Sequence, residues 1–246
     1  MALPKIKSPI FELKLPSSGK AIKYRPFLVK EQKLLLMALE SEDSEEMFRA
    51  IKQIINNCSV DTIDVDELPM FDLEYFFLRL RAKSIGEIVE LKLKHLDEKN
   101  SKGVECKHVT PFELNLLEVE VQKVNGHSNK IILDEQTKIG VAFNYPTVSL
   151  ANKLQRLGTQ NQIDSVVSVI VESIDYIFDA DNVYSAKETS ADELIDFVND
   201  LSQEQFGKLA EFFNKMPKLK HTIKWKCPGC GTTDSIEIEG MANFFG

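Results

Sequence analysis

Apolar residues recur with two different periods along the chain, and each period predicts one kind of secondary structure. Alternating segments predict β-strands at 88–95, 112–116, 117–124, 129–134 and 139–144, with hairpins at 8–25 and 219–238. Segments with apolar residues three or four positions apart predict helices at 28–39, 43–58, 71–83, 163–178, 191–200 and 203–215. Together these segments predict an α+β fold, a helical body with antiparallel β-hairpins.

Pro146 marks the change from strands to a helical region that is expected to last to about Met216. The core candidates of this region are Val166, Val167, Ile170, Ile174, Phe197 and Phe206. Because no low-complexity linker interrupts the chain, we place the boundary near Pro146. This gives an N-terminal α+β region over 1–146 and a helical region ending in a Cys-x-x-Cys hairpin over 147–246, with a single domain as the alternative.

Composition narrows the class of protein. The chain has 246 residues, of which 43% are hydrophobic, enough to bury a core. It has no run of about 18 apolar residues and no signal sequence in residues 1–9, so we expect neither secretion nor a membrane span. Four cysteines without an export signal favour thiol or metal chemistry in the cytoplasm over disulfides, although Cys58 is expected in the core. A net charge of -8 disfavours general nucleic-acid binding, which needs clustered positive charge.

Two hairpins that are far apart in the sequence carry similar residues. The strand that ends at His95 matches, position by position, the strand that ends at Cys227. On the returning arms, Cys106 and Cys230 precede the next strand by the same interval. The loops differ in length, and the Cys-Pro-Gly-Cys turn is the shorter of the two. The sequence therefore predicts two hairpins that present similar side chains at equivalent turns.

Structural zinc sites use four Cys or His ligands in a tetrahedron, and two turns that each supply two ligands form a zinc ribbon. The predicted ligands of one structural Zn²⁺ are His95, Cys106, Cys227 and Cys230. His108 is the alternative to His95, because it lies two positions after Cys106 on the same side of an extended chain. A metal-free turn with reduced thiols and a redox role stay open. The redox role is the weaker, since no βαβ unit places a cysteine at a helix N-terminus.

The sequence carries no motif of a known enzyme. It has no glycine-rich phosphate loop, no Gly-x-Ser-x-Gly elbow and no His-Glu-x-x-His pair. The acidic pairs Asp64/Asp66 and Glu45/Glu46 are expected in solvated turns or helix caps. His127 lies in a predicted turn, where it is expected to form hydrogen bonds rather than act as a general base. We therefore expect a protein that is not an enzyme.

A basic strip precedes and follows Trp225 near the C-terminus. Its members are Lys215, Lys218, Lys220, Lys224 and Lys226. A zinc ribbon with a basic and aromatic surface could bind nucleic acid, and this is the alternative function. Alternate lysines on a strand are also typical of a solvated face that protects a sheet edge, and we favour this interpretation because the chain is acidic overall.

Several blocks of sequence, in order, resemble the T4-like bacteriophage baseplate hub assembly protein family. They are Tyr24–Ala38 (YRPFLVKEQKLLLMA), Leu78–Glu87 (LRLRAKSIGE), Asn125–Ile131 (NGHSNKI), Met216–His221 (MPKLKH) and Phe244-Phe245. Because the blocks span nearly the whole chain, the resemblance is more specific than any single motif. The first hairpin departs from a full Cys-x-x-Cys at His95 and Cys106.

The resemblance implies a non-enzymatic protein that helps to build the hub of a contractile-tail phage baseplate. It would act as an assembly factor or chaperone, or stay in the virion as a hub component. The implied partners are other phage baseplate hub proteins, with no membrane, nucleic acid or small-molecule substrate. The implied location is the host cytoplasm during assembly, or the virion tail baseplate.

Such a protein needs adhesive surfaces. The edges of the two hairpins could add to a partner's sheet. The C-terminal segment supplies the predicted partner-binding residues Met241, Phe244 and Phe245. The alternative is that these aromatic residues fold back and complete the core of their own chain.

Overall fold

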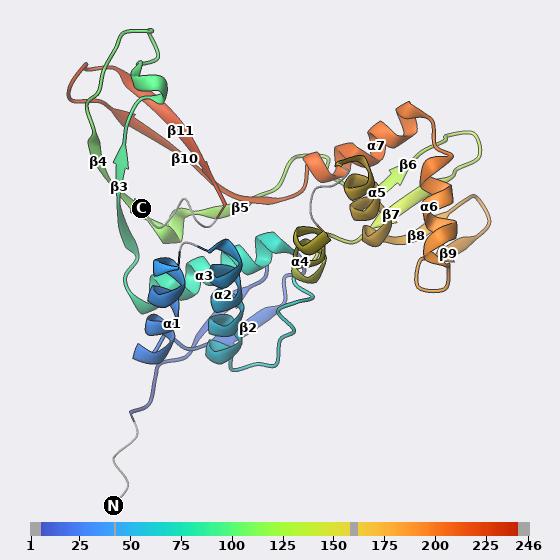
Figure 1. The fold of residues 1–246 in the computed structure, drawn as a ribbon, viewed down its shortest axis with the longest axis horizontal. Coiled ribbons are helices and arrows are strands. Elements are labelled where there is room, and N and C mark those ends of the chain that lie inside the picture. Colours follow the sequence, from blue (N-terminus) through green and yellow to red (C-terminus); the bar gives the residue numbers. More distant parts are fainter. Residues whose placement is uncertain (1–5, 42, 158–161, 241–246) are drawn as a thin grey trace, which may run out of the picture. The chain divides into compact units, whose positions relative to one another are not determined.

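A computed structural model of the chain shows a mixed fold of helices and antiparallel sheets, as the sequence predicts (Figure 1). It describes residues 6–41, 43–157 and 162–240. The chain divides into two compact units. The first unit comprises residues 1–65, 71–122 and 218–246, and the second comprises residues 66–70 and 123–217. The boundary expected near Pro146 lies inside the second unit, while the C-terminal hairpin belongs to the first. Among the described residues, no helix is long and apolar enough to cross a membrane.

The first unit contains the N-terminal hairpin, a group of helices and the later hairpins. Its elements are β1 (Phe11–Lys14), β2 (Ala21–Tyr24), α1 (Val29–Glu40), α2 (Ser44–Cys58), α3 (Met70–Ser84), β3 (Ile88–Leu93), η1 (Leu96–Glu98), β4 (Thr110–Asn115), η2 (Leu116–Glu118), β5 (Glu120–Gln122), β10 (Lys218–Lys226) and β11 (Thr233–Glu239). The hairpins, the helices and the strands expected at 88–95 and 112–116 are confirmed, with small differences at their ends.

The N-terminal hairpin packs on the helices through buried apolar and polar contacts. Ile22 of β2 and Phe76 of α3 are fully buried, and the ring of Tyr24 lies edge-on to that of Phe76 with 5.6 Å between centroids. Asp72 at the start of α3 is also buried. It accepts hydrogen bonds from the backbone N–H of Ser17 at 3.0 Å and from the Ser17 hydroxyl. The turn between β1 and β2 is therefore fixed to α3.

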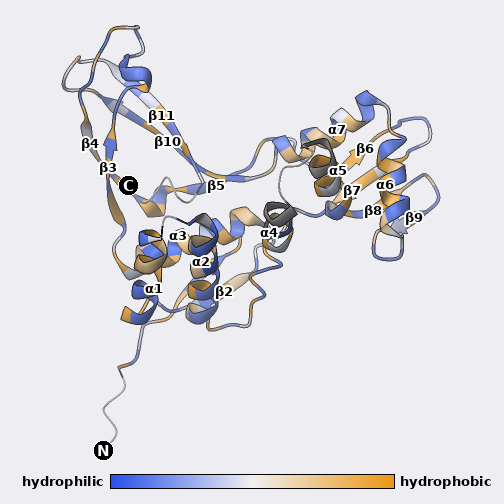
Figure 2. Ribbon diagram, in the orientation of Figure 1, coloured by the Kyte–Doolittle hydropathy of each residue, from blue (hydrophilic) through white to orange (hydrophobic). Residues whose placement is uncertain are grey.

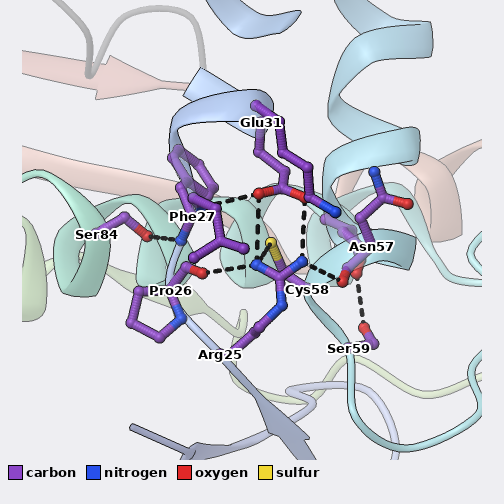
Figure 3. A network of polar contacts seen from close by, with 11 residues as sticks. Arg25, Pro26, Phe27, Glu31, Asn57, Cys58, Ser59 and Ser84 are labelled. Carbon is purple, nitrogen blue, oxygen red and sulfur yellow. Dashed lines mark hydrogen bonds and ion pairs between the residues drawn. The ribbon is translucent and has the colours of Figure 1, made fainter. Parts of the chain in front are cut away.

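A buried ion pair joins the end of β2 to α1 and α2 (Figure 3). Arg25 donates to Glu31 Oε1 at 3.0 Å and to the backbone carbonyl of Asn57 at 2.8 Å. The Glu31 side chain has no exposed area, and it also accepts from the Leu28 N–H at 2.8 Å. Burial raises the pKa of Glu31, but the hydrogen bonds from Arg25 and Leu28 outweigh burial and hold the pKa below its ordinary 4.5. Cys58 is buried beside Arg25, as expected for a core residue.

The later hairpins share one hydrophobic core. β3 pairs antiparallel with β4, and β10 pairs antiparallel with both β11 and β5. Every second residue of β3 is buried, and the shared core includes Leu91 and Leu114 from one hairpin and Ile223 and Trp225 from the other. Arg79 of α3 is buried below this core and donates to two backbone carbonyls in and after η2, at 3.1 and 3.0 Å.

The second unit is a four-stranded antiparallel sheet with helices. Its elements are β6 (Lys130–Ile132), β7 (Gly140–Phe143), α4 (Val148–Leu157), α5 (Gln162–Ser173), β8 (Ile174–Phe178), β9 (Val183–Ser185), α6 (Ala191–Asn199) and α7 (Gln203–Asn214). The strand order is β6-β7-β8-β9. Every residue of β7 is buried, and Figure 2 shows its hydrophobic character. The rings of Phe143 and Phe212 stack in the core with 4.8 Å between centroids.

The helix expected over 163–178 is wrong in its second part. α5 ends at Ser173, and residues 174–178 form β8. β8 pairs with β7 on one side, where Ile174 is opposite Phe143, and with β9 on the other. Its β-branched residues suit a strand, but the deciding contact is with β7, which is distant in the sequence. Local spacing alone could not show that contact.

Other details of the predicted secondary structure also need correction. The strand expected over 117–124 is the turn η2 followed by the short β5, and β9 lies in a region expected to be helical. Val166, a core candidate, is 45% exposed, whereas Ile170 and Ile174 are buried. The other core candidates are partly buried against the core that contains Ile170 and Ile174; they are Val167, Phe197 and Phe206.

We expect Glu31→Gln to lower the free energy of unfolding by about 1–3 kcal/mol at neutral pH, because Arg25 loses its charged hydrogen-bond partner. The folded state keeps Glu31 ionised below the pKa of the unfolded carboxyl, so this stability is present above pH 4.5 and is lost as pH falls through the lower folded pKa. Chemical denaturation at several pH values measures the difference.

The matched control is Glu45→Gln, which removes an exposed carboxylate paired with Arg49 and should change stability by less than about 0.5 kcal/mol. Equal effects of the two substitutions, or a Glu31→Gln effect that persists unchanged at pH 2, would contradict the assigned role of the buried pair.

Candidate metal centre

The turn of the last hairpin begins directly after β10. Two backbone hydrogen bonds close it, from the Gly231 N–H to the Cys227 carbonyl at 2.8 Å and from the Cys227 N–H to the Thr232 carbonyl at 2.9 Å. Gly231 has a φ of 69°, in the left-handed region that glycine enters at little cost. This compact turn holds Cys227 and Cys230 side by side at the end of the hairpin.

The turns of the two hairpins meet, and the four predicted ligands come together there (Figure 1). Their ligand atoms all lie within 4.8 Å of one another. Cys106 Sγ lies 3.8 Å from Cys227 Sγ, and Cys230 Sγ lies 3.4 Å from His95 Nε2. A tetrahedral zinc with Zn–S bonds of about 2.3 Å and Zn–N of about 2.0 Å would put two sulfurs about 3.8 Å apart and sulfur and nitrogen about 3.5 Å apart. The geometry therefore suits a single metal ion.

The structure places His95 in this group and His108 outside it. The side chain of His108 lies against Gly229, and a Cβ built on Gly229 would be only 2.7 Å from the Cβ of His108. His108 therefore fills the space beside the Cys-Pro-Gly-Cys turn instead of pointing a nitrogen into the cluster. This close approach also explains why a glycine stands at position 229.

A carboxylate orients His95. The imidazole has no exposed area, and its Nδ1 lies 2.8 Å from Asp234 Oδ2 on β11. This contact, and then the hydrogen bond with Cys227, raises the pKa of His95 to about 9. Metal-bound histidines commonly donate their second nitrogen to a carboxylate in this way. No sequence motif indicated Asp234, because only the pairing of β11 with β10 places it opposite Trp225 beside the cluster.

The turn favours the thiolate form of two cysteines. Hydrogen bonds from the Asn100 side chain and then from Thr232 lower the pKa of Cys230 to about 5. Burial raises the pKa of Cys227, but hydrogen bonds from the Cys230 backbone and from His95 outweigh it and lower the pKa. Metal ligation requires the thiolate, so the polar surroundings of both residues favour binding of a cation.

The pKa of Cys106 moves the other way. A backbone hydrogen bond at His108 lowers it, but burial and the neighbouring thiols of Cys227 and Cys230 raise it more. Three thiols this close cannot all ionise without a compensating positive charge, because like charges disfavour one another. The chemistry of the donor set thus fits a divalent cation.

The longer loop of the first hairpin is anchored to the second hairpin. Asn100 is buried, and its amide donates to Thr232 Oγ1 at 3.2 Å while its oxygen accepts from the backbone of Lys102 and Val104 at 3.0 Å. The N–H of Cys106 donates to a carbonyl in η1 at 2.7 Å. The ten residues that separate the ligands of this loop therefore fold back and return Cys106 to the site.

Comparison with protein families identifies the chain. The T4 bacteriophage base plate protein family matches residues 8–246, nearly the whole chain. The chain belongs to this family. No curated protein and no solved structure is significantly similar to it. This base plate protein therefore has a structural role in a phage tail, and the four metal-ligand candidates lie within the matched region.

The predicted partner-binding residues Met241, Phe244 and Phe245 lie outside the described residues. His127 was expected to form hydrogen bonds in a turn, but among the described residues its buried Nε2 has no hydrogen-bond partner. Its ring stacks on Phe212 with 5.0 Å between centroids, and burial lowers its pKa. It therefore belongs to the aromatic core of the second unit.

The basic strip is partly neutralised by carboxylates. Lys218 pairs with Glu239 at 2.8 Å, and Lys220 pairs with Glu237 at 3.2 Å, both across the β10–β11 ladder. Lys215 pairs with Glu211 one helical turn earlier. These cross-strand pairs reduce the positive charge that the hairpin offers to a phosphate backbone, in line with the solvated face favoured from the sequence.

We expect Gly229→Ala to lower the free energy of unfolding by about 1–3 kcal/mol, because the new methyl group overlaps His108 and the turn must shift. The same substitution at Gly207, inside α7 with open space around it, should instead raise stability by about 0.5–1 kcal/mol. Thermal and chemical denaturation of the two variants test this. Equal stability of Gly229→Ala and wild type would contradict the close packing of this turn.

Proposed function

We propose that this base plate protein is a non-enzymatic assembly factor or component of the phage tail hub, and that one structural Zn²⁺ holds its two hairpins together. The observation that carries the proposal is the meeting of His95 and three cysteines at zinc-ligand spacing. The hub role rests on the ordered sequence blocks and on membership of the base plate family.

A metal ion would cross-link the two hairpins at their turns and so raise the free energy of unfolding of this part of the first unit. Two-stranded hairpins are marginal in water unless they pack against other structure, and here they share a core that also includes Leu78 and Ala82 of α3. Ligands more than a hundred positions apart in the sequence would be cross-linked by the ion, as between Cys106 and Cys227. The binding free energy of zinc would then become folding free energy of the paired hairpins.

The same ligand set argues against metal catalysis. Catalytic zinc keeps one coordination position for water or substrate, whereas four protein ligands close a structural site. If His95 and the three cysteines all bound one ion, that ion would have no position to offer a substrate. The protein would act by presenting rigid surfaces to other tail proteins.

The metal is expected to be zinc. Zinc accepts a mixed set of thiolates and imidazole in a tetrahedron, as His95 and the three cysteines would provide. A cluster of several irons is held most often by cysteines alone, and ligands on different irons would lie further apart than the 4.8 Å within which all four ligand atoms fall here.

Elemental mass spectrometry of the untagged protein should find about one zinc per chain. The double variant Cys227→Ser and Cys230→Ser should contain none and should unfold at a lower temperature, because two ligands are lost. Absence of metal from the wild type, purified without chelator from zinc-supplemented cells, would overturn the zinc site.

Asp234→Asn should weaken zinc binding about 10- to 100-fold in competition with a chromophoric chelator, since His95 loses the carboxylate that orients it. The matched control is Glu237→Gln on the same strand, whose carboxylate faces Lys220 and not the cluster. Equal affinities for the two variants would show that Asp234 does not support the site.

The hub role is tested in cells infected by a phage that lacks a functional copy of this protein. Tail hubs should fail to form, and wild-type protein supplied from a plasmid should restore them. The cysteine double variant should restore fewer hubs as temperature rises. Normal hubs without the protein would refute the assembly role, whatever the metal content.

A further inference from the structure

α1 exposes an apolar face that no described residue covers. Val29 is 69% exposed, Leu36 50% and Leu39 49%. Exposed apolar side chains scattered singly are common, but a contiguous stripe on one helix marks a binding surface. Figure 2 shows hydrophobic and hydrophilic residues side by side on α1.

The exposed residues follow a heptad pattern. Val29 and Leu36 are seven positions apart, and so are Gln32 and Leu39, so the four residues lie along one side of the helix. The adjoining side of α1, which carries Leu35 one turn before Leu39, is buried and packs against its own unit. α1 thus has one face toward its own unit and one face with the a and d spacing of a helix that pairs with another helix.

Charges on the edge of this stripe fit a second copy of the same chain. Lys33 and Glu40 are also seven positions apart, so they occupy the same edge of the stripe with opposite sign. Both are exposed. When two identical helices pair antiparallel with Leu36 and Leu39 of both copies at the centre, Lys33 of each copy faces Glu40 of the other.

We propose that α1 is a self-association surface, through which two copies of the base plate protein pair by antiparallel contact of their α1 helices. Such a contact is isologous, because each copy uses the same patch. The apolar centre is formed by Leu36 and Leu39 of both copies. Two equivalent Lys33–Glu40 pairs close one edge and fix the antiparallel direction. This surface is separate from the metal-ligand cluster, so the proposal does not depend on zinc.

Sedimentation equilibrium of the full chain is expected to show a monomer–dimer equilibrium at micromolar concentration. Lys33→Glu and Glu40→Lys each create two like-charged contacts in the homodimer, and each should raise the dimer dissociation constant by about tenfold or more. An equimolar mixture of the two variants should recover association close to wild type, because every contact of the mixed dimer again joins opposite charges.

Lys187→Glu is the matched control, since Lys187 is exposed and lies in the second unit. It should leave the dissociation constant unchanged. Leu36→Glu should abolish the dimer, and its melting temperature in dilute solution, where both proteins are monomers, should match that of wild type because Leu36 is half exposed.

A wild type that stays monomeric at hundreds of micromolar would overturn the proposal. So would charge variants that associate like wild type, or a mixture that fails to recover association. Loss of binding to another tail protein in Leu36→Glu, with a wild type that never self-associates, would assign this face to that protein and would also overturn self-pairing.

Discussion

Three thiols and one imidazole, from two hairpins that are distant in the sequence, meet in one partly buried cluster, and the arrangement of the first unit depends on this constraint. Burying so many ionisable groups together is unfavourable unless a cation or hydrogen bonds compensate them. The described residues supply part of the compensation, since Asp234 binds His95 and Asn100 supports the turn at Cys230. The shared core that includes Trp225 holds the two hairpins together, so that the four candidate ligand atoms lie within 4.8 Å of one another.

The sequence blocks that carry the family resemblance support the fold in the first unit. Arg25 and Glu31, both in the first block, form the buried pair that ties β2 to α1 and α2. The N–H of Phe27, in the same block, donates to the Ser84 hydroxyl of the second block at 2.8 Å. These residues connect elements rather than form a reactive site. The residues of these blocks therefore stabilise the fold of the first unit.

A base plate protein needs surfaces that are rigid and specific, and the chain offers rigidity through two different interactions. The Arg25–Glu31 ion pair holds α1 and α2 to the end of β2, and the proposed zinc ion would hold the two hairpins together. α1 is held in place by its packing on α2 and by the burial of Leu35, and its exposed apolar face stays available for binding. An adhesive helix on a fixed support loses little conformational freedom on association, which favours binding.

Features that depend on neighbours along the chain could be predicted from the sequence. Helical spacing gave α1 to α3, and the repeated hairpin pattern indicated His95, Cys106, Cys227 and Cys230 as one group. Features that depend on contacts between distant segments could not be predicted, because they arise only when the chain folds. Pairing with β7 turned the end of a predicted helix into β8, the β10–β11 ladder brought Asp234 to the imidazole, and packing against the Cys-Pro-Gly-Cys turn kept His108 out of the cluster. Periodicity along the chain indicates which face of a helix or strand is apolar. It does not indicate which other element covers that face, because this depends on packing across the whole unit.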